Sequence, residues 1–443
     1  MPIRVAIVGS GPSGFYTAEA LAKSDADCEI DLIERLPAPH GLIRYGVAPD
    51  HQTTKNVARN FDKTAARDEM RFYGNVDIGT DISLDDLRGM YDAVVLAIGS
   101  PEDNKLGIPG EDKQGVIGSA AFVGWYNGHP DFVDLAPDLN SANVCVIGNG
   151  NVAVDIARLL VKTRAELSTS DITNDALDAL QASSVTDVYM LGRRGPVEAK
   201  FTNVELRELK DMAECIPHVR PEQLPDGVEG DYPDRDKRLR ERNLETLRQY
   251  SQKGGEDKPK RIHIEFFASP VEILGTDRIE GIRMERTRVE EGRAIATGEF
   301  FEIPCGLVIP AIGYRGTPLD GAPFDNDHNI IPNEDGRVED GLYVAGWIKR
   351  GPTGVISSNR PDGVAVAGHI IEDFEGSARG DKPGRKALES LLRDRNVRSV
   401  SFDDWHFNVR ASNTEPLLRL NLEALTQQRM EDKRDEVLAI IRT

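Results

Sequence analysis

Two glycine-rich turns constrain the fold of this chain more than any other feature. Gly9-x-Gly11-x-x-Gly14 follows the apolar run IRVAIVG, and GNGNVA at 148–153 follows NVCVIG. An apolar run that stops at glycine is typical of a buried parallel strand. A glycine turn between such a strand and a helix is the dinucleotide-binding fingerprint, because the glycines permit close backbone approach to a pyrophosphate that faces the helix N-terminus. The sequence therefore predicts two βαβ nucleotide sites.

The two predicted sites end in residues of opposite charge. Glu34 closes the strand that follows the first turn, and Arg193 and Arg194 follow the corresponding strand of the second. A carboxylate at this place accepts hydrogen bonds from an adenosine ribose and repels a 2′-phosphate, whereas guanidinium groups bind phosphate through a bidentate fork. We expect FAD or NAD at the first site and NADP(H) at the second, so the contrast favours a chain that holds FAD and NADPH. The alternative for the arginine pair is a solvated turn.

The order of the apolar runs predicts an α/β fold with two Rossmann-like three-layer dinucleotide-binding domains, the NADP domain inserted into the FAD domain. The runs 92–99 and 307–313 look like strands that join the two domains, and 340–346 looks like the strand that returns to the FAD domain. Residues 262–275 read as one strand, and the charge-rich 231–260, without apolar periodicity, as a solvated helix or loop. The expected boundaries are 1–105 plus 320–400 for the FAD domain, 106–319 for the NADP domain and 401–443 for a C-terminal tail.

The composition argues against several other classes of protein. No two of the four cysteines form a C-x-x-C pair, which argues against a redox-active dithiol, a zinc ribbon or an iron–sulfur cluster, and we expect no metal site. A net charge of −20 disfavours nucleic acid and anionic membranes as partners. No apolar run approaches the roughly 18–20 residues of a membrane span, and the N-terminus does not read as a signal peptide. The expected location is therefore cytoplasmic.

Five longer stretches are more distinctive than the glycine turns. They are PAPHGLIRYGVAPDH (37–51), FVGWYNGHPDF (122–132), GNGNVAVDIAR (148–158), GRRGPVEAKFTNVELREL (192–209) and AGWIKRGPTGVISSN (345–359). Together they resemble the adrenodoxin reductase family of ferredoxin–NADP reductases, over roughly residues 3–375. The resemblance implies an FAD enzyme that takes a hydride from NADPH and delivers single electrons to an iron–sulfur ferredoxin.

The resemblance also implies roles for single residues. The expected FAD contacts, beyond the glycine turn, are Ser13, Glu34, Leu42, Ile78, Trp347, Gly354, Val355 and Ile356, the last four at the flavin ring. The expected NADP contacts are Asn149, Gly150, Asn151 and Val152 at the pyrophosphate, Arg193 and Arg194 at the 2′-phosphate, and Glu205. His51 and Asp155 match positions near the redox centre, so they are candidate catalytic residues for proton handling or electrostatic tuning; a plain structural role is the alternative.

Because the chain is acidic, an acidic ferredoxin would need a local basic patch. The family docks ferredoxin on a basic surface, and the matching candidates here are Arg207, Lys210, Arg235, Arg238, Arg240 and Arg242. Acidic residues are interspersed among them, at Asp234, Asp236 and Glu241. A solvated helix face is therefore the alternative interpretation.

The last segment does not resemble the reductases. It contains R-x-S-N-T-E-P at 410–416, which resembles the phosphate loop in the final domain of phosphomannomutase/phosphoglucomutase enzymes. A guanidinium, two hydroxyls and loop amides suit phosphate, but a piece of this size is unlikely to bury an adequate core alone. A vestigial fusion, an anion-binding appendage and a working phosphohexomutase are the three interpretations.

Two other functions compete with ferredoxin reduction. One is an NADPH-dependent electron-input subunit like the glutamate synthase small chain, although that chain normally carries cysteine-rich clusters that are absent here. The other is a flavin-containing structural or regulatory protein without turnover.

Overall fold

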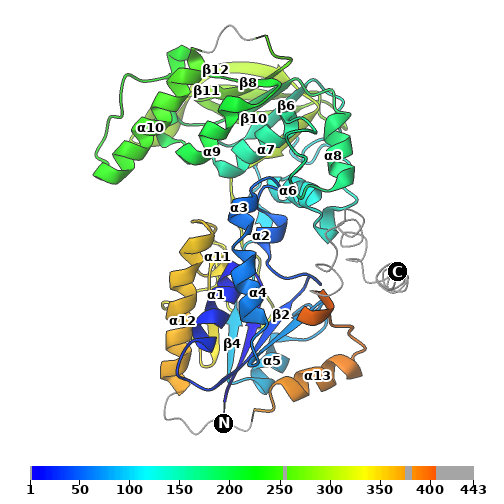
Figure 1. Cartoon of the computed structure of the whole chain (residues 1–443). Coiled ribbons are helices and arrows are strands. Elements are labelled where there is room, and N and C mark those ends of the chain that lie inside the picture. Colours follow the sequence, from blue (N-terminus) through cyan, green and yellow to red (C-terminus); the bar gives the residue numbers. More distant parts are fainter. Residues whose placement is uncertain (1, 253–256, 375–381, 406–443) are drawn as a thin grey trace. The chain divides into compact units, whose positions relative to one another are not determined.

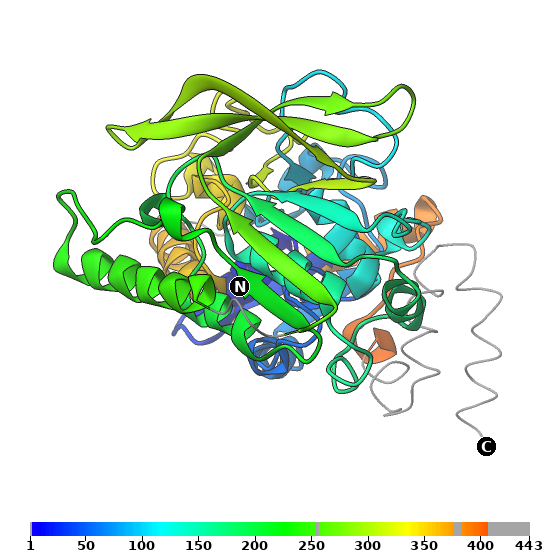
Figure 2. The same ribbon diagram turned by 90° about the horizontal axis from the view of Figure 1, so that it is seen from above.

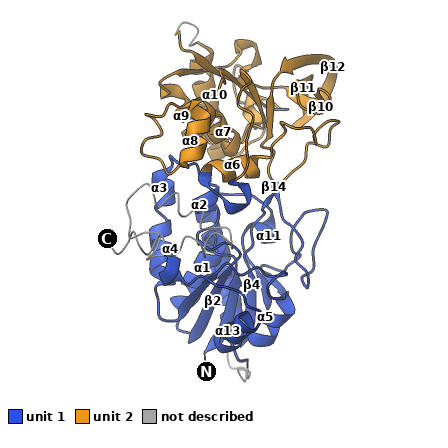
Figure 3. Ribbon diagram, turned by 90° about the vertical axis from the view of Figure 1, so that its right-hand side faces the viewer, with its two compact units in different colours: residues 1–102, 127–133, 314–443 blue, residues 103–126, 134–313 orange. Residues whose placement is uncertain are grey.

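The computed structural model describes residues 2–252, 257–374 and 382–405 (Figure 1). The chain forms two compact units (Figure 3). Unit 1 comprises residues 1–102, 127–133 and 314–443, and unit 2 comprises residues 103–126 and 134–313. The chain passes between them at 102/103, 126/127, 133/134 and 313/314. The first of these boundaries lies in β5 (Glu102–Asp103), and the last directly precedes β14 (Tyr314–Arg315). Within the described ranges, no helix is both long and apolar enough to cross a membrane.

Unit 1 is built on a six-stranded sheet in the order β15-β16-β4-β1-β2-β3. Its strands are β1 (Ile3–Val8), β2 (Cys28–Glu34), β3 (Met70–Gly74), β4 (Ala93–Leu96), β15 (Arg337–Glu339) and β16 (Leu342–Val344). All neighbours are parallel except β15 and β16. The four residues of β4 are all buried, as expected for a parallel strand that is covered on both faces. Parallel pairing brings the carboxyl ends of β1, β2 and β4 to one edge, where the first glycine turn lies.

Helices cover both faces of this sheet. One core joins Phe15 of α1 (Pro12–Ala22), Phe61 of α4 (Ala58–Ala65) and Val366 of α12 (Asn359–Phe374). The other joins Leu87 of α5 (Leu84–Met90) and Leu388 of α13 (Arg385–Asp394). The remaining short helices are α2 (Leu42–Tyr45), α3 (Gln52–Lys55), α11 (Trp347–Arg350) and the 3₁₀ turns Pro130–Phe132 and Ile356–Ser358. Unit 1 therefore has the three layers, helix–sheet–helix, that the sequence predicts.

Unit 2 is built on a five-stranded parallel sheet in the order β13-β6-β7-β9-β8. Its strands are β6 (Asn143–Ile147), β7 (Asp187–Leu191), β8 (Cys215–His218), β9 (Lys260–Glu265) and β13 (Leu307–Pro310). Its helices are α7 (Asn151–Val161), α8 (Asn174–Gln181), α9 (Asn203–Glu208) and α10 (Asp234–Ser251), with 3₁₀ turns at Pro196–Glu198, Leu209–Asp211 and Pro221–Gln223. α6 (Ser119–Asn127) ends at the boundary between the units. The predicted α/β fold is confirmed in both units.

The second outer layer of unit 2 is a sheet rather than a set of helices. β10 (Ala268–Leu274), β11 (Gly281–Glu290) and β12 (Arg293–Pro304) form an antiparallel sheet, drawn in lime green along one side of the unit in Figure 2. Ile282 and Ile303 from this sheet share a core with Cys145 and Val308 of the parallel sheet. α7 contacts β6, β7 and β9. This sheet carries one of the binding residues proposed below.

The segment after α12 belongs to unit 1 as far as the structure describes it. Val400 pairs with Gly74 beyond the edge of the sheet, and Phe402 and Trp405 join the core around Phe15. The motif that starts at Arg410 lies outside the described residues.

Candidate functional site

The first glycine turn has the geometry of a close backbone approach. Gly9 has φ +105°, and a Cβ at Gly14 would lie 2.0 Å from the carbonyl oxygen of Gly9. A Cβ at Gly11 would instead meet no protein atom within 4 Å, so this glycine leaves space for a ligand. Gly11 caps α1 without a side-chain hydrogen bond to the first turn, so the first amides of the helix stay available for an anion.

A cavity of about 410 Å³ opens at this edge of the unit 1 sheet. Seven of the residues that the sequence assigns to FAD line it, namely Gly9, Gly11, Ser13, Glu34, Leu42, Ile78 and Trp347. Gly14, Gly354, Val355 and Ile356 are not part of its lining, although Asn359, directly after the Ile356–Ser358 turn, is. The cavity therefore joins Glu34, expected at the ribose, with Trp347, one of the four residues expected at the flavin ring.

Three protein donors hold the Glu34 carboxylate at the end of β2. Ser10 donates to Oε2 from its backbone N–H, at 2.9 Å, and from its hydroxyl, at 2.6 Å. The backbone N–H of Leu36 donates to Oε1 at 3.1 Å. A carboxylate oxygen accepts more than one hydrogen bond, so the oriented group can also accept from the hydroxyls of a ribose.

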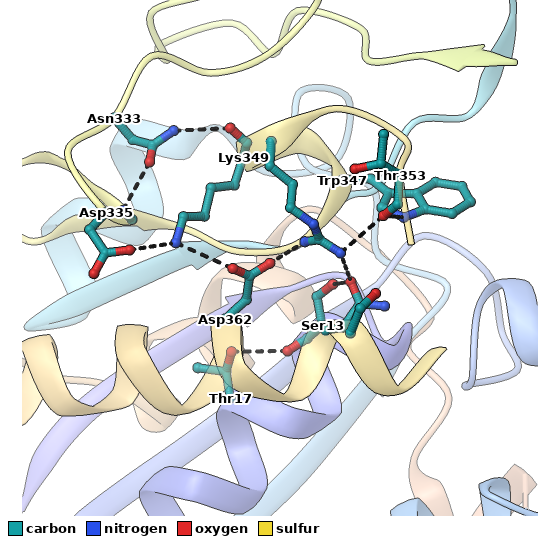
Figure 4. Close-up of polar contacts among 12 residues, drawn as sticks. Ser13, Thr17, Asn333, Asp335, Trp347, Lys349, Thr353 and Asp362 are labelled. Atoms are coloured by element: carbon teal, nitrogen blue, oxygen red, sulfur yellow. Dashed lines mark hydrogen bonds and ion pairs between the residues drawn. The ribbon is translucent and has the colours of Figure 1, made fainter. Parts of the chain in front are cut away.

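The loop between α11 and α12 is tied to the first glycine turn by a polar network (Figure 4). The indole N–H of Trp347 donates to the carbonyl of Thr353 at 3.1 Å. Arg350 donates to the same carbonyl at 3.3 Å and to Oδ1 of Asn359 at 3.0 Å. Ser13 also donates to Oδ1 of Asn359, at 3.1 Å. The sequence did not single out Arg350 or Asn359, although both lie inside the quoted stretch 345–359.

The network continues through two cations and two carboxylates. Arg350 forms an ion pair with Asp362 of α12, and Nζ of Lys349 lies 3.3 Å from Asp362 and 3.0 Å from Asp335. Lys349 and Asp362 are mostly buried, at 10% and 15% side-chain exposure. Alternating charges therefore fix α11 against α12 on the side facing the loop.

The second glycine turn repeats the geometry of the first in unit 2. Gly148 has φ +141°, and a Cβ there would lie 2.2 Å from the carbonyl oxygen of Ala311. Gly150 caps α7 without a side-chain hydrogen bond and faces open space. Oδ1 of Asn151 accepts from the backbone N–H of Thr202 at 2.7 Å. Thr202 also caps α9, where its hydroxyl accepts from the N–H of Glu205, so the helix carrying Glu205 is tied to the turn.

A second cavity, of about 380 Å³, lies at the end of β7. Arg193 and Arg194 line it, as the sequence predicts for neighbours of a bound phosphate, and so does Arg293 from the start of β12. Arg293 belongs to no sequence motif, because it is a lone arginine that directly follows a hairpin turn.

The structure places the two catalytic candidates differently. Asp155 lies on α7 and forms an ion pair with the buried Arg158 at 2.9 Å, which in turn lies 3.2 Å from Glu208. His51 caps α3 and is half-buried; it does not line the unit 1 cavity.

The six basic docking candidates separate into groups. Arg207 of α9 and Arg238 and Arg242 of α10 line one open hollow of about 540 Å³. Arg240 points elsewhere, since it stacks over the Tyr232 ring at 4.2 Å and donates to the carbonyl of Val197. Lys210 and Arg235 do not line the hollow. Three of the six docking candidates therefore line the same hollow.

Comparisons with known proteins identify the family and the fold of the chain. The family described as "Pyridine nucleotide-disulphide oxidoreductase" matches residues 3–195, and "Phosphoglucomutase/phosphomannomutase, C-terminal domain" matches residues 377–440. The chain is 41% identical over 430 residues to the mitochondrial NADPH:adrenodoxin oxidoreductase of Arabidopsis thaliana, covering 91% of this chain and 89% of that protein. It is 41% identical over 391 residues to the NADPH-ferredoxin reductase FprA of Mycobacterium tuberculosis, covering 86% of each. The structure of FprA in complex with NADPH superposes with a TM-score of 0.88 at 37% identity, over 95% of this chain and all of that one.

Proposed function

Since the chain belongs to the family of NADPH:adrenodoxin and NADPH-ferredoxin oxidoreductases, we propose that it holds FAD in unit 1 and NADPH in unit 2 and transfers electrons from NADPH to an iron–sulfur ferredoxin. One observation carries the assignment of the two cofactors. The unit 1 cavity contains a carboxylate that protein donors already satisfy, whereas the unit 2 cavity contains three arginines. The first suits a ribose with free hydroxyls, and the second suits a ribose 2′-phosphate.

The residues of unit 1 fit FAD. The free amides at the start of α1 and the open space at Gly11 suit a pyrophosphate, and Glu34 suits the adenosine ribose. Trp347 and Asn359 line the same cavity, and we place the flavin ring next to them, beside Gly354, Val355 and Ile356. Bound FAD would supply the step between two-electron and one-electron chemistry.

The residues of unit 2 fit NADPH. The turn Asn149–Val152 would receive the pyrophosphate at the N-terminus of α7, with Glu205 of the tied helix α9 as a further contact. Arg193 and Arg194 would bind the 2′-phosphate. Hydride transfer depends mainly on positioning, so we assign Asp155, which is held by Arg158, to electrostatic tuning, and keep His51 as the candidate for proton handling.

Ferredoxin would dock on the hollow between α9 and α10. Arg207, Arg238 and Arg242 line it, and complementary charge would raise the association rate of an acidic partner. Glu241 and Glu245 line the same hollow, so the patch is less positive than its arginine count suggests. We expect the contribution of docking to fall steeply as salt is added.

Steady-state assays test this function. Purified protein should show flavin absorption that NADPH bleaches, and it should reduce cytochrome c with NADPH much faster when a ferredoxin is added. NADH should be a poor donor. Protein that is colourless and does not take up FAD on reconstitution would overturn the proposal.

Docking is tested separately. Replacing Arg207, Arg238 and Arg242 with Gln should raise the KM for ferredoxin about 10-fold or more, since each docking ion pair contributes on the order of 0.5–1 kcal/mol, while NADPH-to-ferricyanide activity stays intact. Arg240→Gln is the matched control, because Arg240 is engaged by Tyr232 and Val197. Equal loss of both activities would contradict a docking role.

A further inference from the structure

Three arginines from two distant parts of the sequence line one cavity in unit 2. Arg193 and Arg194 follow β7, and Arg293 begins β12 of the antiparallel sheet, which lies at one side of the unit in Figure 3. The cavity measures about 380 Å³, which is within the usual range for a small-molecule site. Its lining also offers the hydroxyls of Ser269 and Thr287. A hairpin outside the βαβ unit thus contributes to the arginine end of the nucleotide site.

None of the three guanidinium groups forms an ion pair with a described carboxylate. Arg194 makes one long hydrogen bond, of 3.5 Å, to the carbonyl of Gly292. Other arginines of the same sheet are paired: Arg283 with Glu272 and Glu302, and Arg288 with Glu290 at 2.6 Å. In a chain with 74 acidic and 54 basic residues, unpaired arginines around one cavity leave a positive potential that an anionic ligand would neutralise.

The backbone places Arg293 at a defined position. Glu290 pairs with Arg293 across the hairpin, so Glu291 and Gly292 form a two-residue turn. Both have positive φ, at 48° and 74°, as a type I′ turn requires. This turn matches the twist of the two strands, and it therefore holds Arg293 at the mouth of the cavity.

The arginine pair is fixed against the same hairpin. The hydroxyl of Thr287 on β11 donates to the carbonyl of Arg193 at 2.7 Å, and the backbone N–H of Phe267 donates to the carbonyl of Arg194 at 3.1 Å. The cavity contains one carboxylate, Glu285, which accepts from the N–H of Gly298 at 3.0 Å. The hairpin and the segment after β7 are thus one hydrogen-bonded assembly.

We propose that Arg293 is a third guanidinium for the 2′-phosphate of NADPH, and that the β11–β12 hairpin therefore helps the enzyme to select NADPH over NADH. A phosphate monoester presents three acceptor oxygens and close to two negative charges, so it offers acceptor sites for a further guanidinium beside the arginine pair. This inference rests on the proposed NADPH site in unit 2. It adds a selectivity residue that no nucleotide-binding motif predicts.

The test compares ligands that differ only in the 2′-phosphate. Arg293→Gln should weaken binding of 2′,5′-ADP, measured by calorimetry, about 10- to 100-fold, as expected for one charge-assisted hydrogen-bonding group. Binding of 5′-AMP should stay the same. In ferricyanide assays the KM for NADPH should rise by a similar factor, while kcat/KM for NADH does not fall. Arg288→Gln, on the same hairpin but paired with Glu290, is the matched control and should leave all four quantities unchanged.

The outcomes separate this inference from the function on which it rests. Unchanged 2′,5′-ADP affinity in Arg293→Gln would overturn the role of Arg293, and so would equal weakening of 2′,5′-ADP and 5′-AMP. Wild-type protein that binds neither 2′,5′-ADP nor NADPH would refute the NADPH site itself. Should Arg293→Gln fail to fold, Arg293→Lys serves instead: it keeps the charge but loses the planar fork, and it should give a smaller but selective loss of 2′,5′-ADP binding.

Discussion

Removing the Arg350 side chain should disturb the loop that carries Gly354 more than it destabilises the protein. One guanidinium holds the loop at several points: it pairs with Asp362, and it donates to the carbonyl of Thr353 at 3.3 Å and to Asn359 at 3.0 Å. The same Thr353 carbonyl accepts from the indole of Trp347. Arg350 is therefore a positioning residue for the expected ring end of the FAD site.

The expected loss of stability depends on the contacts that Asp362 and Asn359 keep when Arg350 is replaced. Breaking a fully buried ion pair costs about 3–5 kcal/mol because a charge is left without a partner. In Arg350→Met, Asp362 keeps Lys349 at 3.3 Å, and Asn359 keeps Ser13 at 3.1 Å. Arg350 is itself 25% exposed. We therefore expect a global loss of about 2 kcal/mol, or about 4–8 °C in Tm for a unit of this size. Arg350→Lys should restore part of it, since an ammonium keeps the ion pair but not the fork.

The assay must separate positioning from stability. Arg350→Met should alter the flavin's visible circular dichroism and slow its reduction by NADPH in stopped flow at saturating NADPH, with Arg350→Lys intermediate. Arg337→Met is the matched control, since Arg337 also pairs with α12, through Glu372 and Asp373, and should lower Tm without touching the spectrum. If Arg350→Met loses stability but keeps the wild-type spectrum and reduction rate, the positioning role is wrong.

Three further predictions concern unit 1. Gly14→Ala should lower both the Tm and the flavin content, because the added Cβ would lie 2.0 Å from a backbone oxygen. Gly11→Ala should lower the flavin content alone, because its Cβ would meet no protein atom within 4 Å. The flavin-to-protein ratio and the Tm of the apoprotein distinguish the two variants. Burial raises the pKa of Asp31 to about 6, against the lowering effect of Arg385, so the folded state binds this proton more tightly than the unfolded state. About 2 kcal/mol of stability should therefore be lost as the pH rises from 4 to 6. Urea midpoints of Asp31→Asn should vary less than wild type in that window, and parallel curves would disprove the assignment. Trp405→Ala should cost about 3–5 kcal/mol, because the ring is 4% exposed; an unchanged Tm would show that this aromatic contributes nothing to the core.

The elements that the sequence predicted well are those set by local rules. Both βαβ units follow from apolar runs that stop at glycine, and the structure has β1, α1 and β2 in one unit and β6, α7 and β7 in the other. The prediction of one strand over 262–275 is wrong, because Phe267 adopts φ 55° and separates β9 from β10. The prediction of a solvated helix or loop over 231–260 is correct for the first half of α10 (Asp234–Ser251), but the statement that this stretch lacks apolar periodicity is wrong for the second half. The second half of α10 buries Leu244, Leu247 and Tyr250, an apolar stripe that the charged first half obscures.

Some of the site residues could be predicted from the sequence and others could not. Glu34 and Arg193 could be located because a strand end has a fixed place relative to the glycine turn. Arg293 and Arg350 could not, since each acts through contacts between segments far apart in the chain. Neither hydrophobic periodicity nor motif spacing predicts a contact between segments that are far apart in the chain. The tail motif from Arg410 lies outside the described residues, so its three interpretations remain as the sequence left them.

The contrast between the two strand ends is sharper in the structure than in the sequence. Glu34 and Arg193 differ in the sign of their charge and also in the protein groups that bind each side chain. Three neutral donors from its own unit hold the carboxylate, so it keeps its negative charge and is oriented to accept hydrogen bonds from the hydroxyls of a ribose. No described carboxylate pairs with Arg193 or Arg293, and both side chains are exposed, so their positive charge is accessible to an anionic ligand. Cofactor selectivity in such a chain therefore depends on which charges the fold leaves uncompensated, and the β11–β12 hairpin adds to that imbalance at the NADPH end alone.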